Sequence, residues 1–260
     1  MKEIYFIRHG QTNENSLGIR QGSEIDSELN ELGRIQAKKT GKYLKKYRIN
    51  GKKFDCIISS PMKRAIETAE IIKEEIKYPK KIEIFDELIE LRRGKMSGLA
   101  EDNKYRKKIE KEVKKKQKKI GDPIEYIYEF DMDKYLNSKF DVGIETKSEM
   151  NVRSKKIIDF IESKKCKKIL VVSHAGIIMN TIKKMFNLNF TPIGNLSNGK
   201  NCWISYIRRD DGIYKLVSPP DSTHLGLNHR MIKCKLPNHN CYNFLSENFC
   251  ENTLKMVCLL

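Results

Sequence analysis

The fold is decided by the stretch Ile4-Tyr5-Phe6-Ile7-Arg8-His9-Gly10, in which an apolar run leads directly into an arginine, a histidine and a glycine. A second stretch, Ile169-Leu170-Val171-Val172-Ser173-His174-Ala175-Gly176, has the same form. Short apolar runs of this kind are typical of strands that are buried on both faces of a parallel sheet. We therefore expect two central strands, each followed at its carboxyl end by a histidine.

Strand and helix patterns alternate along the rest of the chain. Further strands are expected at residues 54–58 and 81–85, and helices at 30–44, 61–72, 145–163 and 177–186. Asp211-Gly212 is a strong hairpin signal between two strand-like segments, 201–207 and 212–217. This order predicts an α/β protein: a three-layer α/β/α sandwich with a mainly parallel central sheet, a cap insertion and a C-terminal hairpin.

The first of these helices has a clear beginning and an apolar face. Asn30 is a favourable N-cap residue. Leu32, Ile35, Ala37 and Leu44 recur at a spacing that places them together. We expect this face to point into the core.

The length of 260 residues suits one large domain with an appendage. We expect residues 1–225 to form the domain, with a cap insertion at about 99–142, and residues 226–260 to form a tail of unknown role. The lysine-rich segment 104–119 in the insertion has Tyr105, Ile109 and Val113 at four-residue spacing, which predicts an amphipathic helix. Its lysine face either recruits a polyanionic substrate or is simply solvated.

Composition limits the classes of partner. Lys and Arg number 51 against 34 Asp and Glu, a net charge of +17 that would attract nucleic acid, acidic lipid or phosphorylated metabolites. A lysine-rich surface that keeps the protein in solution explains the same charge. No window approaches the roughly 18 unbroken apolar residues of a membrane helix, and no signal-peptide pattern is present. We expect a cytoplasmic protein whose seven cysteines are reduced thiols.

The tail carries histidines and cysteines that could be read as zinc ligands. They are His229, Cys234, His239, Cys241 and Cys250. Their spacing lacks the paired C-x-x-C hooks of zinc fingers. We therefore expect no metal site.

Four segments are expected to bring polar side chains to one place. Ligands of an open parallel sheet bind beyond the carboxyl ends of its strands, where His9 and His174 are expected. The turn after the 54–58 strand, Ser59 to Ala65, would deliver Arg64, and the segment after the 81–85 strand would deliver Glu90. Taken singly, these are a packed histidine, a surface arginine or a solvated carboxylate. Together they predict an active site.

Phosphoryl transfer requires this set of groups. A neutral His9 imidazole can attack phosphorus and form a phosphohistidine. Arg8 and Arg64 supply paired N–H donors for the phosphoryl oxygens, and His174 adds a third contact. Glu90 can protonate the leaving oxygen and later deprotonate water. Gly10 would let substrate approach the backbone, and the three cationic groups would replace a metal.

These motifs resemble the histidine phosphatase superfamily, in the branch that contains cofactor-dependent phosphoglycerate mutases and related small phosphatases. Arg8 to Asn15 looks like the RHG-x-[ST]-x-x-N signature, and Ser59 to Ala69 matches the second motif. Glu90, the Gly143-Ile144-Glu145-Thr146 turn and Ser173 to Gly176 follow in the family's order. The loop at residues 22–26 is one residue longer than expected.

The resemblance implies a role for each residue. His9 would be phosphorylated and Glu90 would donate the proton, while Arg8, Arg64 and His174 complete the phosphate pocket. The residues expected to line the substrate site are Thr12, Asn15, Gln21, Gly22 and Ala175. The implied enzyme is a metal-independent, histidine acid-type phosphatase that hydrolyses phosphomonoesters without a cofactor.

The main alternative is a cofactor-dependent phosphoglycerate mutase, which would require 2,3-bisphosphoglycerate. Mutases resemble one another in an arginine directly after the acid and a paired arginine in the insertion. Here Leu91 follows Glu90 and the insertion carries lysines, although Arg92-Arg93 could substitute. An inactive binding module is a weaker alternative, because the two histidines and the acid are present. No nucleic-acid recognition motif is present. We expect a phosphorylated small molecule or phosphopeptide as substrate, and the sequence leaves the oligomeric state open, a homodimer included.

Overall fold

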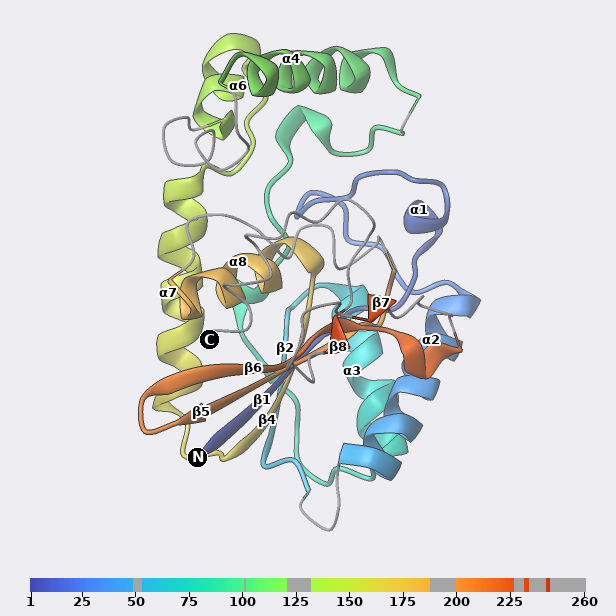
Figure 1. Cartoon of the computed structure of the whole chain (residues 1–260). Helices are drawn as coiled ribbons and strands as arrows, with labels where there is room; N and C mark the ends of the chain where they lie inside the picture. The colour runs from blue at the N-terminus through green and yellow to red at the C-terminus, as the bar shows by residue number, and fades with distance from the viewer. Residues whose placement is uncertain are drawn as a thin grey trace.

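The computed structural model describes residues 1–48, 53–100, 102–120, 132–187, 200–226, 232–233 and 242–243. Within these residues, a six-stranded sheet lies between two layers of helices (Figure 1). In the order β3-β2-β4-β1-β5-β6, the strands are Glu83–Ile84, Cys56–Ser59, Lys168–Ser173, Lys2–Arg8, Ile204–Asp210 and Ile213–Asp221. The first four strands are parallel to one another. Strand β5 is antiparallel to both of its neighbours, β1 and β6. The predicted sandwich with its mainly parallel sheet and C-terminal hairpin is confirmed.

Two pairs of helices cover the two faces of the sheet. The pairs are α2 (Glu31–Tyr43) with α3 (Lys63–Glu75), and α7 (Lys147–Ser163) with α8 (Ala175–Met185). Side chains of a strand alternate between faces. Ile4 and Phe6 of β1 therefore pack in the cluster under α7 and α8, whereas Tyr5 and Ile7 pack in the cluster under α2 and α3. All four are almost completely buried, which explains the unbroken apolar run.

The remaining elements are short or belong to the insertion. They are α1 (Asn13–Ser16), a π-helical turn (Leu44–Arg48), 3₁₀ turns (Asp86–Leu88, Gly94–Met96, Thr223–Leu225), α4 (Lys104–Ile120), α6 (Met132–Phe140), β7 (Ile232–Lys233) and β8 (Tyr242–Asn243). Of the described helices, none is long and apolar enough to cross a membrane.

The buried face of α2 differs from the prediction. Asn30 caps the helix as expected, its Oδ1 accepting a hydrogen bond of 2.8 Å from the Gly33 amide. However, Leu32 and Ile35 are 48% and 45% exposed. The buried residues of α2 are the small ones, Gly33, Ala37, Thr40 and Gly41. Small side chains let α2 approach α3 closely: a Cβ on Gly41 would come within 2.6 Å of the Glu75 Cβ. The prediction is therefore wrong for Leu32 and Ile35, whereas Ala37 and Leu44, just after the helix, are buried as predicted.

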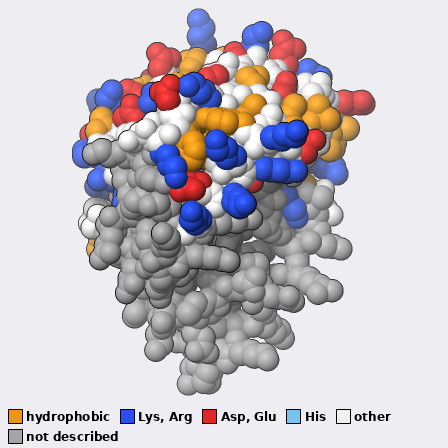
Figure 2. Space-filling model, turned by 90° about the horizontal axis from the view of Figure 1, so that it is seen from above, with side chains coloured by type: hydrophobic (Ala, Val, Ile, Leu, Met, Phe, Trp, Pro, Cys, Tyr) orange, Lys and Arg blue, Asp and Glu red, His pale blue; other side chains and the backbone are white. Residues whose placement is uncertain are grey.

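The insertion forms its own small core beyond the carboxyl edge of the sheet. Ile109 of α4 and Leu136 of α6 are buried together with Met96 and Val142, and α4 and α6 lie at the top of Figure 1. Seen from above, this end of the molecule carries many Lys and Arg side chains among acidic and apolar ones (Figure 2). The side chain of Val113, residues 121–131 and almost all of the tail lie outside the described residues, so the domain boundaries and the tail's lack of metal stay predictions.

The expectation of reduced cysteines is wrong for one pair. Cys56 and Cys166 form a disulfide with a Cα–Cα distance of 6.1 Å. Cys56 begins β2 and lies opposite Ile169 of the neighbouring strand β4, so the residues just before β4 come within bridging distance. The expectation rested on cellular location, which carries no information on such pairing across strands. Cys202 is a buried free thiol, and the four tail cysteines lie outside the described residues.

Candidate active site

The carboxyl ends of three neighbouring strands meet at one place. Arg8 at the end of β1 lies opposite Ser173 at the end of β4, and Ser59 ends β2 beside Val172. The residue that follows each strand is polar and buried: His9 after β1, His174 after β4 and Ser60 after β2. The rings of His9 and His174 have their centroids 5.0 Å apart, with planes inclined by 55°. The structure therefore brings together two histidines that are far apart in the sequence.

The geometry of His9 fixes which ring nitrogen carries the proton. Its Nδ1 lies 2.7 Å from the carbonyl oxygen of Gly10. A carbonyl oxygen can only accept, so Nδ1 must be the donor. In the neutral imidazole, the lone pair is then on Nε2.

The turn that follows β1 is held by residues that the sequence did not point out. The Asn201 side-chain amide donates hydrogen bonds of 3.2 Å to the carbonyl oxygens of both His9 and Gly10. The Gly10 amide donates to the Thr68 hydroxyl at 2.9 Å. Asn201 lies just before β5, the strand that pairs with β1, and that adjacency is visible only once the strand order is known.

Gly10 is required for a different reason from the predicted one. A Cβ at this position would lie 2.5 Å from the carbonyl oxygen of Gly33 in the first turn of α2. The close neighbour is thus the protein's own backbone, and the approach of a substrate to Gly10 stays a prediction. Gly33 is constrained in the same way, because its Cβ would lie 2.1 Å from the Gln11 carbonyl oxygen. The two glycines let α2 pack directly against the turn that carries His9.

The ring of His174 is held by the Ser60 side chain. Its Nε2 lies 2.8 Å from the Ser60 hydroxyl, and Ser60 also accepts a bond of 3.3 Å from the Met62 amide. The Nδ1 of His174 is buried, and among the described residues no partner reaches it. If Ser60 donates to Nε2, then Nδ1 carries a hydrogen for an acceptor in the pocket.

Both predicted arginines lie beside the histidines. Arg64 in the first turn of α3 is 1% exposed and donates to the carbonyl oxygens of Ile25 at 2.7 Å and Gly22 at 3.0 Å. Arg8 donates to the carbonyl oxygen of Lys200 at 2.8 Å. Burial lowers the pKa of each guanidinium, and the negative charge of Glu90 opposes that shift in both. Glu90 is therefore close enough to act on both cations.

The electrostatics keep both imidazoles neutral. Burial, together with the charges of Arg64 and Arg8, holds the pKa of His9 well below its ordinary value of 6.5. Burial and the same cations likewise hold the pKa of His174 well below that value. A neutral imidazole is the form with a free lone pair, which a nucleophile needs.

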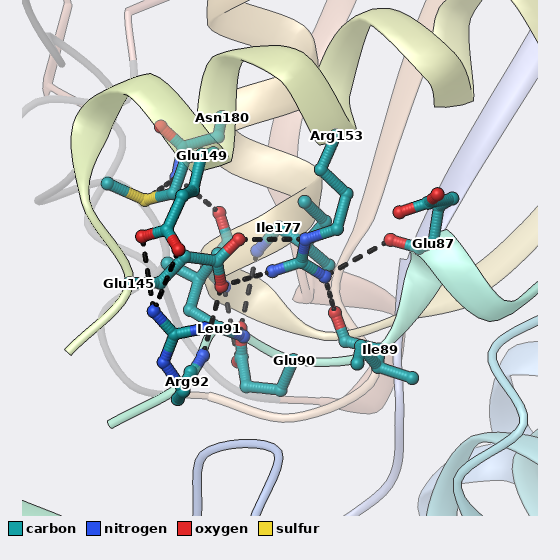
Figure 3. Close-up of polar contacts among 12 residues, drawn as sticks. Glu87, Ile89, Glu90, Leu91, Arg92, Glu145, Glu149, Arg153, Ile177 and Asn180 are labelled. Atoms are coloured by element: carbon teal, nitrogen blue, oxygen red, sulfur yellow. Dashed lines mark hydrogen bonds and ion pairs between the residues drawn. The ribbon is translucent and has the colours of Figure 1, made fainter. Parts of the chain in front are cut away.

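Glu90 lies at the N-terminus of α8, the helix that begins directly after His174. Its carboxylate accepts hydrogen bonds from the first turn of α8, from the Gly176 amide at 3.2 Å and the Ile177 amide at 3.3 Å (Figure 3). It also accepts one of 2.8 Å from the Leu91 amide. A Cβ on Gly176 would lie 2.5 Å from a carboxylate oxygen of Glu90. The glycine after His174 and Ala175 is thus explained by the approach of the acid.

The residues expected to bind substrate are largely engaged with one another. Thr12 caps α1, and its hydroxyl accepts from the Asn15 amide at 3.2 Å and from the Gln21 side chain at 2.7 Å. Asn15 in turn accepts from Asn201 at 3.0 Å. Gly22 adopts a positive φ of 64° and binds Arg64 through its carbonyl oxygen. Ala175 begins α8 directly after His174. These five residues lie around the histidines, and their contact with substrate stays a prediction.

The loop at residues 22–26 joins the two sides of the site. Besides its carbonyl contacts with Arg64, its Asp26 accepts a bond of 2.8 Å from the Lys63 amide. Its Glu24 carboxylate accepts bonds of 2.9 and 2.6 Å from the amides of Arg93 and Gly94, just after Glu90. The described residues contain no group of three or more His, Cys, Asp or Glu side chains that could hold a metal ion.

Comparison with known proteins agrees with this class of fold and site. The sequence profile of the histidine phosphatase superfamily (branch 1) matches residues 4–221, so the chain belongs to this superfamily. A metal-independent phosphoserine phosphatase of Arabidopsis thaliana is 28% identical over 224 residues, 86% of this chain and 83% of the relative. The uncharacterized phosphatase PhoE of Bacillus subtilis is 40% identical over 79 residues, and this match spans only 38% of that relative's length.

Solved structures show the same fold. The crystal structure of phosphoglycerate mutase from Bacillus anthracis superposes with a TM-score of 0.67 at 26% identity, over 86% of this chain and 95% of that chain. A phosphoserine phosphatase of Entamoeba histolytica in complex with phosphoserine gives a TM-score of 0.59 at 23% identity, over 86% and 100%. The second likeness supports the fold alone.

Proposed function

We propose that the protein is a phosphomonoester hydrolase that works through a covalent phosphohistidine on His9. The observation that carries this proposal is the Nδ1 contact of His9 with the Gly10 carbonyl. It leaves the Nε2 lone pair of a buried, neutral imidazole directed away from its own backbone, beside His174 and two guanidinium groups. A neutral nucleophile surrounded by fixed cationic and N–H donors is what attack on a phosphate dianion requires.

In the first step, Nε2 of His9 attacks phosphorus and the bond from phosphorus to the ester oxygen breaks. Arg8 and Arg64 donate to the phosphoryl oxygens as negative charge spreads over them. His174 donates through Nδ1, with Ser60 holding Nε2. The leaving oxygen takes a proton from the carboxyl group of Glu90. The products are an alcohol and a phosphohistidine.

In the second step, water attacks the phosphohistidine. The Glu90 carboxylate takes a proton from this water, so the bond from phosphorus to nitrogen breaks and inorganic phosphate is released. His9 recovers its lone pair and Glu90 recovers its proton, which closes the cycle. The same cationic groups serve both steps, and neither step draws on a metal or a cofactor.

The substrate that we propose is a phosphorylated small molecule, with phosphoserine as the first to test because the relative matched over most of its length is a metal-independent phosphoserine phosphatase. A phosphopeptide is the alternative. The mutase reaction is less well supported. Of the two arginines that could bind its substrate's carboxylate, Arg92 already binds Glu149 at 3.0 Å and the Gly143 carbonyl oxygen at 3.0 Å, which leaves Arg93 as the candidate.

The proposal is tested by trapping the intermediate. The purified chain is mixed with ³²P-labelled phosphoserine, quenched within milliseconds and digested. We expect an acid-labile, base-stable label on the peptide that contains His9, and none in a His9→Asn variant. A wild type that hydrolyses para-nitrophenyl phosphate without such a label would overturn the covalent mechanism. Inert protein would favour a binding module.

A second assay separates hydrolase from mutase. The protein is incubated with 3-phosphoglycerate in the presence and absence of 2,3-bisphosphoglycerate. We expect release of inorganic phosphate at the same rate in both, with no 2-phosphoglycerate. Isomerisation that depends on the bisphosphate would replace the hydrolase by the mutase.

A further inference from the structure

Glu90 lies in an irregular segment whose shape is set by side chains from elsewhere. This segment, residues 87–92 and hereafter the acid loop, has no strand pairing, and its backbone groups must find partners outside regular structure. Arg153 of α7 supplies two of them: its Nη1 donates to the carbonyl oxygens of Glu87 at 3.1 Å and Ile89 at 2.6 Å (Figure 3). The Ser173 hydroxyl donates to the carbonyl oxygen between them, that of Leu88, at 2.6 Å.

Arg153 is itself held by Glu145. The Nε and Nη2 of Arg153 donate to the two carboxylate oxygens of Glu145 at 2.9 and 2.5 Å. This is a bidentate pair, and both residues are buried: Arg153 is 9% exposed and Glu145 is 8% exposed. Glu145 also accepts a bond of 3.0 Å from the amide of Arg92, and its own amide donates to the Arg92 carbonyl oxygen at 3.0 Å. The ion pair therefore holds the acid loop on both sides of Glu90.

The Glu90 carboxylate is fixed as a consequence. With the backbone tied at Ile89 and at Arg92, the side chain extends onto the amides of Gly176 and Ile177, next to His174. Buried ion pairs contribute little net stability compared with apolar side chains of the same volume. A buried pair whose remaining donors and acceptors all go to one catalytic loop has a use beyond stability.

We propose that Arg153 and Glu145 are positioning residues that set the place of Glu90 for proton transfer. This inference rests on the proposed function, in which Glu90 is the proton donor. Its physical basis is that a displacement of about 1 Å in a catalytic group costs roughly 100-fold in rate. Neither residue touches the substrate; both act through the backbone of the acid loop.

The test uses the chemistry of the leaving group. An alkoxide leaves only when it is protonated, whereas para-nitrophenolate is weakly basic and leaves without help. The measured quantity is therefore the ratio of kcat/KM on phosphoserine to kcat/KM on para-nitrophenyl phosphate, in one preparation of each variant, because kcat/KM excludes the hydrolysis step that the two substrates share. Unfolded protein lowers both rates equally, so the ratio reports on the fraction that stays folded.

Four single variants of the full chain, the last of them a control, and two double variants are compared with wild type. We expect Glu90→Gln to lower the ratio about 100-fold, the size of a general-acid contribution. Arg153→Lys keeps the positive charge but cannot reach two carbonyls and a carboxylate in a fork, and Glu145→Gln keeps the shape but removes the charge. Each should lower the ratio about 10-fold. Combined with Glu90→Gln, neither should lower it further.

Glu162→Gln is the matched control. Glu162 lies further along the same helix, where it binds the Tyr214 hydroxyl at 2.7 Å and Arg209 at 3.0 Å, away from the acid loop. This variant loosens α7 without touching Glu90, so its ratio should equal that of wild type.

The outcomes separate the two proposals. If Glu90→Gln leaves the ratio unchanged, Glu90 is not the proton donor and the positioning role fails with it, whereas the phosphohistidine on His9 stands or falls by the trapping experiment. If Glu90→Gln lowers the ratio but Arg153→Lys and Glu145→Gln do not, the positioning role alone is overturned and the proposed function stands. An equal fall with Glu162→Gln would also overturn positioning, because loosening of α7 in general would then be the cause.

Discussion

The two halves of the site are built in different ways. In the nucleophile half, His9, Arg8 and His174 follow directly from central strands, and their positions are set by sheet pairing and by burial. In the acid half, Glu90 lies in an irregular loop that Arg153, Glu145 and Ser173 hold by their side chains. The nucleophile half therefore depends mainly on backbone pairing, which the side chains of Asn201, Thr68 and Ser60 complete. The acid half depends on particular side chains, so substitutions at a distance can alter it separately.

The largest expected effect is in the nucleophile half. His9→Asn should lower kcat by at least about 1,000-fold on phosphoserine and on para-nitrophenyl phosphate alike, because it removes the covalent step itself. The control is His224→Asn, at a half-buried histidine that lies against α2, 2.9 Å from Thr40. A large loss that is confined to phosphoserine would assign His9 to the acid's role and break the comparison.

Arg64→Lys should come next. Lysine can offer one point charge but cannot bind the Gly22 and Ile25 carbonyls and a phosphoryl oxygen together. We expect kcat/KM to fall about 100-fold on both substrates, the usual cost of losing a transition-state donor. Arg34→Lys, at an arginine whose side chain is 48% exposed and pairs with Glu67, should change kcat/KM less than twofold. Equal effects of the two would remove Arg64 from the phosphate pocket.

The pH dependence of stability tests how completely the histidines are buried. Burial lowers the pKa of His224 to about 4, and it also lowers the pKa of His9 and of His174. Below pH 6.5 these residues bind protons in the unfolded chain but not in the folded one, so the free energy of unfolding falls as the pH falls. His224 alone should account for about 2 kcal/mol between pH 7.5 and 5.0.

Urea unfolding of wild type and His224→Gln at both pH values measures this term. The variant should lose about 2 kcal/mol less than wild type on acidification. A wild type that is equally stable at both pH values would show that the buried histidines are protonated when folded.

The smallest effect is expected from the lysine face of α4, which belongs to neither half. Exposed lysines are screened by salt and contribute little to a small ligand. Replacing Lys104, Lys107, Lys108 and Lys111 together by Gln should raise KM for phosphoserine no more than about twofold, with kcat unchanged. A larger rise, limited to acidic phosphopeptides or multiply phosphorylated substrates and lost at high salt, would show that this face recruits polyanions.

The same contrast explains what the sequence could predict. An apolar run that ends in a histidine indicates a central strand, and the histidine marks its carboxyl end. Strands β1 and β4 and the proximity of His9 to His174 could therefore be predicted from the pattern alone. Arg64 and Glu90 were predicted because they follow the other parallel strands. The family resemblance then supplied their proposed roles.

Contacts between side chains and backbone over long sequence distances could not be predicted. Nothing in the residues around Arg153 or Asn201 signals that their donors end on the acid loop or on the turn after β1. The small residues of α2 and the pairing of Cys56 with Cys166 escaped for a related reason. Each depends on how closely two elements approach, which hydrophobic periodicity does not measure.

The loop at residues 22–26 has a consequence for the range of molecules that fit the pocket. It is anchored near both ends to the first turn of α3, through Lys63 and Arg64, and in its middle to Arg93 and Gly94. Its covalent length therefore sets the distance between the proposed phosphate-binding groups and the proposed proton donor. Adding or removing a single residue there would change that distance by up to about 3.5 Å. An insertion or deletion in this loop could thus change the size of substrate that fits, with every proposed catalytic side chain unchanged.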